Sequence, residues 1–152
     1  MTSPATSRGR DDKRLRLAAV LFVVAYLIHG ADHLRRGFGA LTDAVFWGGN
    51  LQGVLGLATV ILVLAGHRWA PAAAVAVGFG SAAGFVAVHF LPEWGAFSDS
   101  FVTGDVIWFS WAAASIEVAA DLFLGYAGLR VLRRDGLVPL RAPAGGPAGE
   151  TL

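Results

Sequence analysis

The chain has 152 residues, of which 55% are hydrophobic and 15% are charged, and its formal net charge is +1. Soluble domains carry about 25% charged residues, so this composition excludes an ordinary soluble domain and indicates a protein of the lipid bilayer. The length is that of a single domain. Because the sequence contains no cysteine, disulfides and thiolate metal sites are also excluded.

Four apolar segments each approach the length of about 20 residues that a helix needs to cross the hydrocarbon core. None shows the alternation of a membrane-spanning strand, so we predict an all-α integral membrane protein, a four-transmembrane-helix bundle within residues 13–134. Residues 1–12 and the Pro/Gly-rich residues 135–152 are expected to form disordered tails. The predicted spans are residues 15–34, 44–65, 70–91 and 106–132.

The first predicted span ends in an unusual group of ionisable residues: His29, Asp32 and His33. Such side chains are costly inside a bilayer and therefore point to a function. Residues three and four apart lie on one face of a helix, so the three side chains are expected to point the same way. Two imidazoles and a carboxylate on one face could ligate a metal ion, bind haem or relay protons.

The second and third predicted spans carry polar residues at a similar depth, near the same side of the membrane. Asn50 and Gln52 lie on the second span, His89 lies near the end of the third, and Glu93 follows it. Both spans also contain pairs of glycines four residues apart, a spacing that lets helices pack closely. The loop at 92–101 mixes aromatic and acidic residues, and either covers the histidines or lies among the lipid headgroups.

The fourth predicted span contains Ser110 near one end and Glu117 and Asp121 deeper in the membrane. The two acidic residues are four apart and share a helix face. Two ionised carboxylates would repel each other in a low dielectric, so at least one should be protonated, or both should meet a donor or a cation.

Basic residues predict the orientation of the bundle, because Lys and Arg concentrate in cytoplasmic loops. They precede the first span, follow the fourth, and occur in the turn between the second and third, whereas the two opposite loops are rich in acids. We therefore expect a multi-pass plasma-membrane protein with both termini cytoplasmic and the acidic loops outside. The acids in those loops are Asp43, Glu93, Asp99 and Asp105, beside Arg35 and Arg36.

A metal or haem site is the leading interpretation of the polar residues. His29 and His33 have the spacing of paired ligands in helical zinc sites. With His89, and with Asp32 or Glu93 as oxygen ligands or hydrogen-bond acceptors, they form a set suited to zinc, copper or iron. A haem would instead take one imidazole from each of two helices. The alternative is that these side chains only hydrogen-bond between helices.

The sequence thus predicts an outward-facing polar pocket that binds a metal ion or haem, with Glu117 and Asp121 at its floor handling protons. Asn50, Gln52 and Ser110 are expected to line it. If the protein is an enzyme, metal-assisted hydrolysis or redox chemistry on a lipophilic small molecule would suit such a site. A proton-coupled small-molecule transporter and a structural, partner-binding or homo-oligomeric subunit without cofactor remain alternatives. The bilayer is the expected partner, and no nucleic-acid-binding motif is present.

Overall fold

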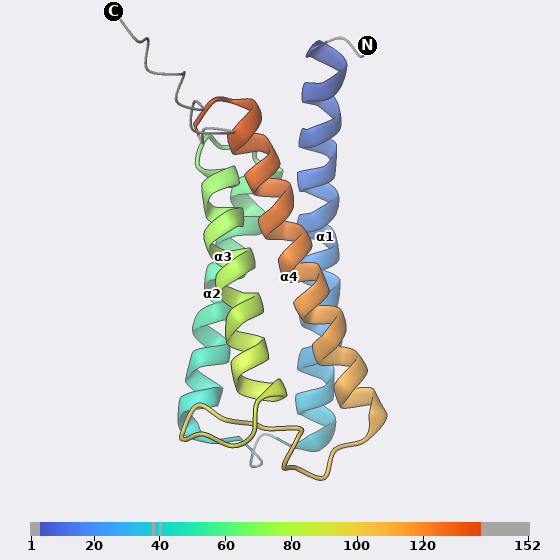
Figure 1. Cartoon of the computed structure of the whole chain (residues 1–152), viewed down its shortest axis with the longest axis vertical. Coiled ribbons are helices and arrows are strands. Elements are labelled where there is room, and N and C mark those ends of the chain that lie inside the picture. Colours follow the sequence, from blue (N-terminus) through green and yellow to red (C-terminus); the bar gives the residue numbers. More distant parts are fainter. Residues whose placement is uncertain (1–3, 38, 40, 138–152) are drawn as a thin grey trace, which may run out of the picture.

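A computed structural model describes residues 4–37, 39 and 41–137, which form a bundle of antiparallel helices (Figure 1). The described residues contain no strand, and four helices are long and apolar enough to cross a membrane. The predicted all-helical class is confirmed, and so is the presence of four helices of spanning length and composition. The helices are α1 (Pro4–Arg36), α2 (Asp43–Leu64), α3 (Ala70–Phe85) with the π-helical turn η2 (Val86–Phe90), and α4 (Trp108–Arg134).

The helix ends follow local sequence signals. Gly37 ends α1 with a φ of 84°, and its N–H donates to the carbonyl of His33 at 2.9 Å. The Thr42 hydroxyl caps α2 by accepting a hydrogen bond from the N–H of Val45. Pro71 lies in the first turn of α3, where its missing N–H costs nothing. The predicted boundaries of the second, third and fourth spans therefore lie close to those observed.

The first helix starts much earlier than the predicted span, at Pro4. Part of the stretch expected as a disordered tail is therefore helical. Two ion pairs with α4 connect this part of α1 to the bundle, from Asp11 to Arg130 at 3.4 Å and from Asp12 to Arg134 at 2.7 Å. Residues 1–3 and 138–152, the remainder of the two predicted tails, lie outside the described residues.

Close packing within the bundle is concentrated between α3 and α4. A Cβ atom added to Gly78 would lie 2.4 Å from the backbone nitrogen of Gly125, and one added to Gly128 would lie 2.6 Å from the carbonyl oxygen of Pro71. These three glycines let the two backbones touch, as small residues do between membrane helices. By contrast, α2 exposes many large apolar side chains, as expected of a lipid-facing helix.

We expect Gly78→Ala to destabilise the bundle, because the new methyl group would collide with backbone atoms that cannot rotate away. The expected loss is about 1–3 kcal/mol in the free energy of unfolding. Gly80→Ala is the matched control on the same helix, since a Cβ there would meet nothing within 4 Å. Thermal unfolding in detergent, followed by circular dichroism, checks both variants. Equal melting temperatures for the two would contradict the packing described.

Candidate metal centre and adjoining cavity

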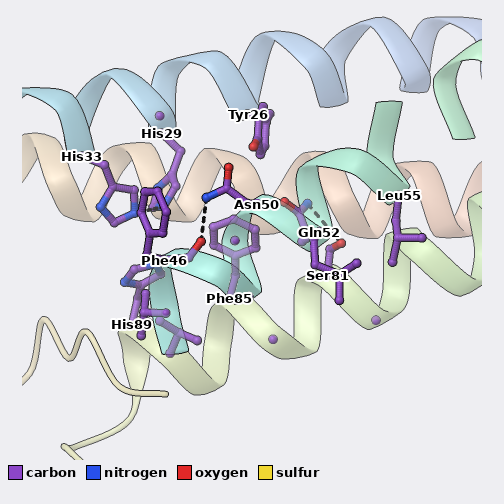
Figure 2. A pocket seen from close by; sticks show the side chains of 18 of the residues that line it. Tyr26, His29, His33, Phe46, Asn50, Gln52, Leu55, Ser81, Phe85 and His89 are labelled. Carbon is purple, nitrogen blue, oxygen red and sulfur yellow. Dashed lines mark hydrogen bonds between the residues drawn. The ribbon is translucent and has the colours of Figure 1, made fainter. Parts of the chain in front are cut away.

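Three histidines from two parts of the chain converge at one end of the bundle. His29 and His33 come from α1 and His89 comes from η2, and one ligating atom from each lies within 4.8 Å of the others. The Nε2 atoms of His29 and His33 are 2.9 Å apart, and the rings of His29 and His89 meet edge to face at 4.9 Å between centroids. Figure 2 shows the three side chains turned toward one another. His29 and His89 are only 4% and 2% exposed.

The local structure of each helix explains this convergence. His29 and His33 are one turn apart on α1, so they share a face as predicted. His89 belongs to the π-helical turn, whose wider i→i+5 pattern changes the direction in which the following side chains point. Phe85, one turn earlier, packs edge to face against His29 at 4.8 Å and fixes the contact between α1 and α3. Such turns inside α-helices frequently occur at functional sites.

The orientation of His89 is fixed by Asp99, from the loop that follows. Nδ1 of His89 lies 3.0 Å from the backbone carbonyl oxygen of Asp99 and 3.5 Å from its carboxylate. The carbonyl oxygen can only accept a hydrogen bond, so Nδ1 donates to it and carries the proton, and Nε2 keeps its free lone pair. Metal-binding histidines usually donate their second ring N–H to a carbonyl or carboxylate in this way. Nε2 of His89 is therefore prepared to act as a ligand.

Asp99 is held in turn by Arg36, whose guanidinium donates two hydrogen bonds of 2.6 and 2.7 Å to the carboxylate. Burial opposes the charge of Asp99, but these hydrogen bonds and the charge of Arg36 outweigh it and hold the pKa of Asp99 below its usual value. The bidentate pair fastens the loop to the end of α1. Asp99 was not among the predicted site residues, since nothing in its spacing from His89 distinguishes it from the other loop acids.

The loop 91–107 folds over the histidines. The N–H groups of Asp99 and Phe101 donate to the carbonyls of Val88 and His89, which are left free at the end of the helix. Phe101 is buried, and its ring centroid lies 4.5 Å from that of His89. The Arg36 guanidinium also lies over the Phe101 ring, 5.2 Å from the ring centroid, as in a cation–π contact. The loop therefore packs directly against His89.

The two predicted oxygen ligands are not part of the close group of potential ligands found among the described residues. Asp32 is fully buried, but its Oδ1 accepts a hydrogen bond from Arg35 at 2.8 Å, and the same guanidinium reaches Ser110 on α4 at 3.1 Å. Asp32 and Ser110 thus belong to a contact between α1 and α4. Glu93 is exposed in the loop. The carboxylate that pairs with His89 is that of Asp99.

A cavity of about 990 Å³ opens between α1, α2 and α3, with the three histidines at one end (Figure 2). The predicted pocket residues Asn50 and Gln52 line it. The Asn50 amide donates to the carbonyl of Phe46 at 2.8 Å, and the Gln52 amide nitrogen donates to Ser81 at 3.2 Å. The Gln52 amide oxygen is buried and has no hydrogen-bond partner among the described residues. Most other lining residues are apolar or glycine.

Several glycines that were expected to pack helices together instead border this cavity. A Cβ atom added to Gly49, Gly80 or Gly84 would meet nothing within 4 Å. The packing interpretation is therefore wrong for these three, because α1, α2 and α3 diverge beside them. It is correct for Gly53, where an added Cβ would collide with the Tyr26 ring.

Glu117 and Asp121 do not line this cavity. Both are 0% exposed, on the face of α4 that packs against α1 and α3, and none of their four carboxylate oxygens has a hydrogen-bond partner among the described residues. The prediction that Glu117 and Asp121 form the floor of the pocket is therefore wrong, and both lie in the interior of the bundle instead. Their role in handling protons stays a prediction.

Comparison with known proteins adds no family to these observations. None of the protein-family models, curated proteins or solved structures that were compared with the chain matches it.

Proposed function

We propose that this chain is a multi-pass membrane protein that binds one transition-metal ion through His29, His33 and His89. The close approach of three ring nitrogens, from α1 and η2, carries the proposal. In a tetrahedral zinc site with bonds of about 2.0–2.1 Å, ligand nitrogens lie roughly 3.3 Å apart, so small ring rotations would complete the site. Imidazole suits zinc, copper and iron alike.

The geometry favours a single ion over a haem. Two axial imidazoles would have to lie on opposite faces of the haem, with the macrocycle between them. The rings of His29 and His89 are already in edge-to-face contact, at 4.9 Å between centroids. A macrocycle would therefore require the helices to separate, whereas an ion would replace only the hydrogen bond between His29 and His33.

The proposed site has three ligands, and its fourth coordination position would face the cavity. Catalytic zinc sites keep such an open position, whereas structural sites close it with a fourth protein ligand. A bound ion would act there as a Lewis acid or would activate water, which suits hydrolytic chemistry on a lipophilic substrate. A copper or iron ion would suit redox chemistry instead.

The proposed orientation places the histidines on the outer side of the plasma membrane. The start of α1, the α2–α3 turn and the end of α4 lie together at one end of the bundle, and the two loops near the histidines lie at the other (Figure 1). The first of these ends carries most of the basic residues, which favours its placement in the cytoplasm. Arg35 and Arg36 at the opposite end form ion pairs with Asp32 and Asp99.

Metal analysis of the full-length chain tests the proposal. Protein purified in detergent and loaded separately with Zn²⁺ and Co²⁺ is expected to retain one ion per chain in elemental mass spectrometry. The His29→Ala, His33→Ala double variant is expected to retain none, while a His67→Ala control, in the exposed α2–α3 turn, should match the parent. Parent protein that retains no ion would overturn the proposal and favour a purely structural role for the histidines.

We expect Asp99→Asn to weaken metal binding, because the change removes the carboxylate that pairs with Arg36 and faces His89. Loss of such an orienting partner typically lowers metal affinity by about 10–100-fold. Asp105→Asn, an exposed change in the same loop, serves as the control. Competition with a chelator measures both affinities, and an unchanged affinity in Asp99→Asn would show that the backbone carbonyl alone orients His89.

A further inference from the structure

We propose that the cavity beside the three histidines binds a lipid-soluble amphiphile with an anionic, metal-coordinating oxygen headgroup, such as a fatty acid. This inference rests on the proposed metal binding and extends it to the class of molecule that reaches the metal. In the bound state, the headgroup oxygens occupy the open coordination position and the tail lies along the cavity.

The size and polarity of the cavity support a molecule of this kind. Its volume of about 990 Å³ is at the upper end of the range of about 300–1,000 Å³ that small-molecule sites occupy. The histidines are at one end, next to Phe85, while Leu55, Ala76 and Val77 line the cavity farther along α2 and α3 (Figure 2). This polarity matches a molecule with one coordinating end and an apolar body.

The cavity is also continuous with the lipid-facing surface. Leu51 and Leu55 line it, yet they are 62% and 50% exposed, so the same side chains contact both the cavity and the surroundings of the bundle. Apolar side chains exposed on a membrane-spanning helix face acyl chains. A ligand would therefore enter sideways from the bilayer, past the exposed side chains of α2, without crossing an aqueous phase.

Glycines keep the space beside the histidines open. Gly80 and Gly84 line the cavity on α3, and Gly49 faces them from α2. Since an added Cβ at each would meet nothing within 4 Å, no neighbouring helix requires the glycine. Glycine lowers helix stability by about 0.5–1 kcal/mol relative to alanine. Since packing does not require glycine at these positions, we infer that the absence of side chains there serves to keep the cavity open.

Charge selects the headgroup. A divalent ion bound by three neutral imidazoles keeps its full positive charge, and the neighbouring carboxylates of Asp32 and Asp99 are already paired with Arg35 and Arg36. An anionic oxygen headgroup would compensate this charge in a low-dielectric environment. Farther along, the unpartnered amide oxygen of Gln52 could accept a hydrogen bond from a hydroxyl on the tail. Gln52 contacts Ser81, which is eight residues from His89, or roughly 12 Å along a helix.

Titration of the Co²⁺-loaded, full-length protein with octanohydroxamate tests the proposal, because the visible absorption of Co²⁺ changes when a new oxygen ligand binds. We expect saturable binding to the parent, and binding at least tenfold weaker for acetohydroxamate, which has the same headgroup without the tail. Gly84→Leu should also weaken octanohydroxamate binding at least tenfold by filling the cavity. Ala83→Leu, the neighbouring residue that is exposed and does not line the cavity, should bind like the parent.

The possible failures are distinguishable. Equal binding of the two hydroxamates, or unchanged binding in Gly84→Leu with its Co²⁺ content intact, would overturn the amphiphile site and leave the metal site standing. A Co²⁺ spectrum that does not respond to either hydroxamate would do the same. Absence of bound Co²⁺ in the parent would overturn both proposals together.

Discussion

His89→Ala is expected to reduce metal affinity by about two to three orders of magnitude. Structural zinc sites with four ligands bind with about 10–16 kcal/mol, so each ligand contributes roughly 2.5–4 kcal/mol. The two remaining ligands, His29 and His33, both belong to α1, and a two-coordinate ion would be easily removed by a chelator. The measurement is a chelator competition titration with the purified full-length chain, in parallel with the parent protein.

This experiment also separates a ligand from a structural residue. His89 packs against Phe101 and hydrogen-bonds to Asp99, so its loss could loosen the loop as well as the metal. Asp99→Asn loosens the same contact and leaves the imidazole in place. If His89→Ala and Asp99→Asn reduce affinity equally, His89 acts through the loop and is not a ligand. A much larger loss in His89→Ala identifies it as a ligand.

The double variant Glu117→Met, Asp121→Leu is expected to raise stability by about 1–4 kcal/mol. Both carboxyl groups are fully buried, and none of their oxygens has a partner among the described residues. Replacing buried polar groups of this kind with apolar side chains of similar shape is often neutral or stabilising, because the cost of their desolvation disappears. Thermal unfolding in detergent measures the effect.

The opposite result would be equally informative for these two residues. If the double variant is less stable than the parent, the prediction is wrong. A cation, a water molecule or a shared proton then stabilises the two carboxyl groups in the folded protein. Glu93→Gln provides a control for loss of an acidic group at an exposed position. A pronounced loss of stability would favour the alternative of proton-coupled transport through the interior of the bundle, beside α4.

The features predictable from the sequence are those set within one helix. Apolar segments of about 20 residues predicted four helices of spanning length, and the observed ends of α2, and of α3 together with η2, lie within one residue of the predicted ends. The helical repeat also placed His29 and His33 on one face of α1, where the structure has them. The early start of α1 was missed because its residues are polar, and the ion pairs that connect them to α4 are contacts between helices.

Contacts between helices were predictable only in part. His89 was correctly grouped with the histidines of α1 from its depth alone, although depth does not indicate which way a side chain points. Asp99 was missed for the same reason: Glu93 and Asp99 lie in one loop, and only its folding back over η2 brings Asp99 to His89. Asp32 has the correct depth, but the nearby Arg35 and Ser110 draw it toward α4.

The sequence by itself therefore determined the all-helical class, the four segments apolar enough to cross a membrane and the helix face that carries the first two histidines, because hydropathy and the 3.6-residue period are local properties. The tertiary structure alone decided which carboxylate orients His89, that Gly80 and Gly84 border a cavity, and that Glu117 and Asp121 lie apart from it. Each of these depends on the distance and rotation between separate helices, which side-chain packing sets and no local pattern records.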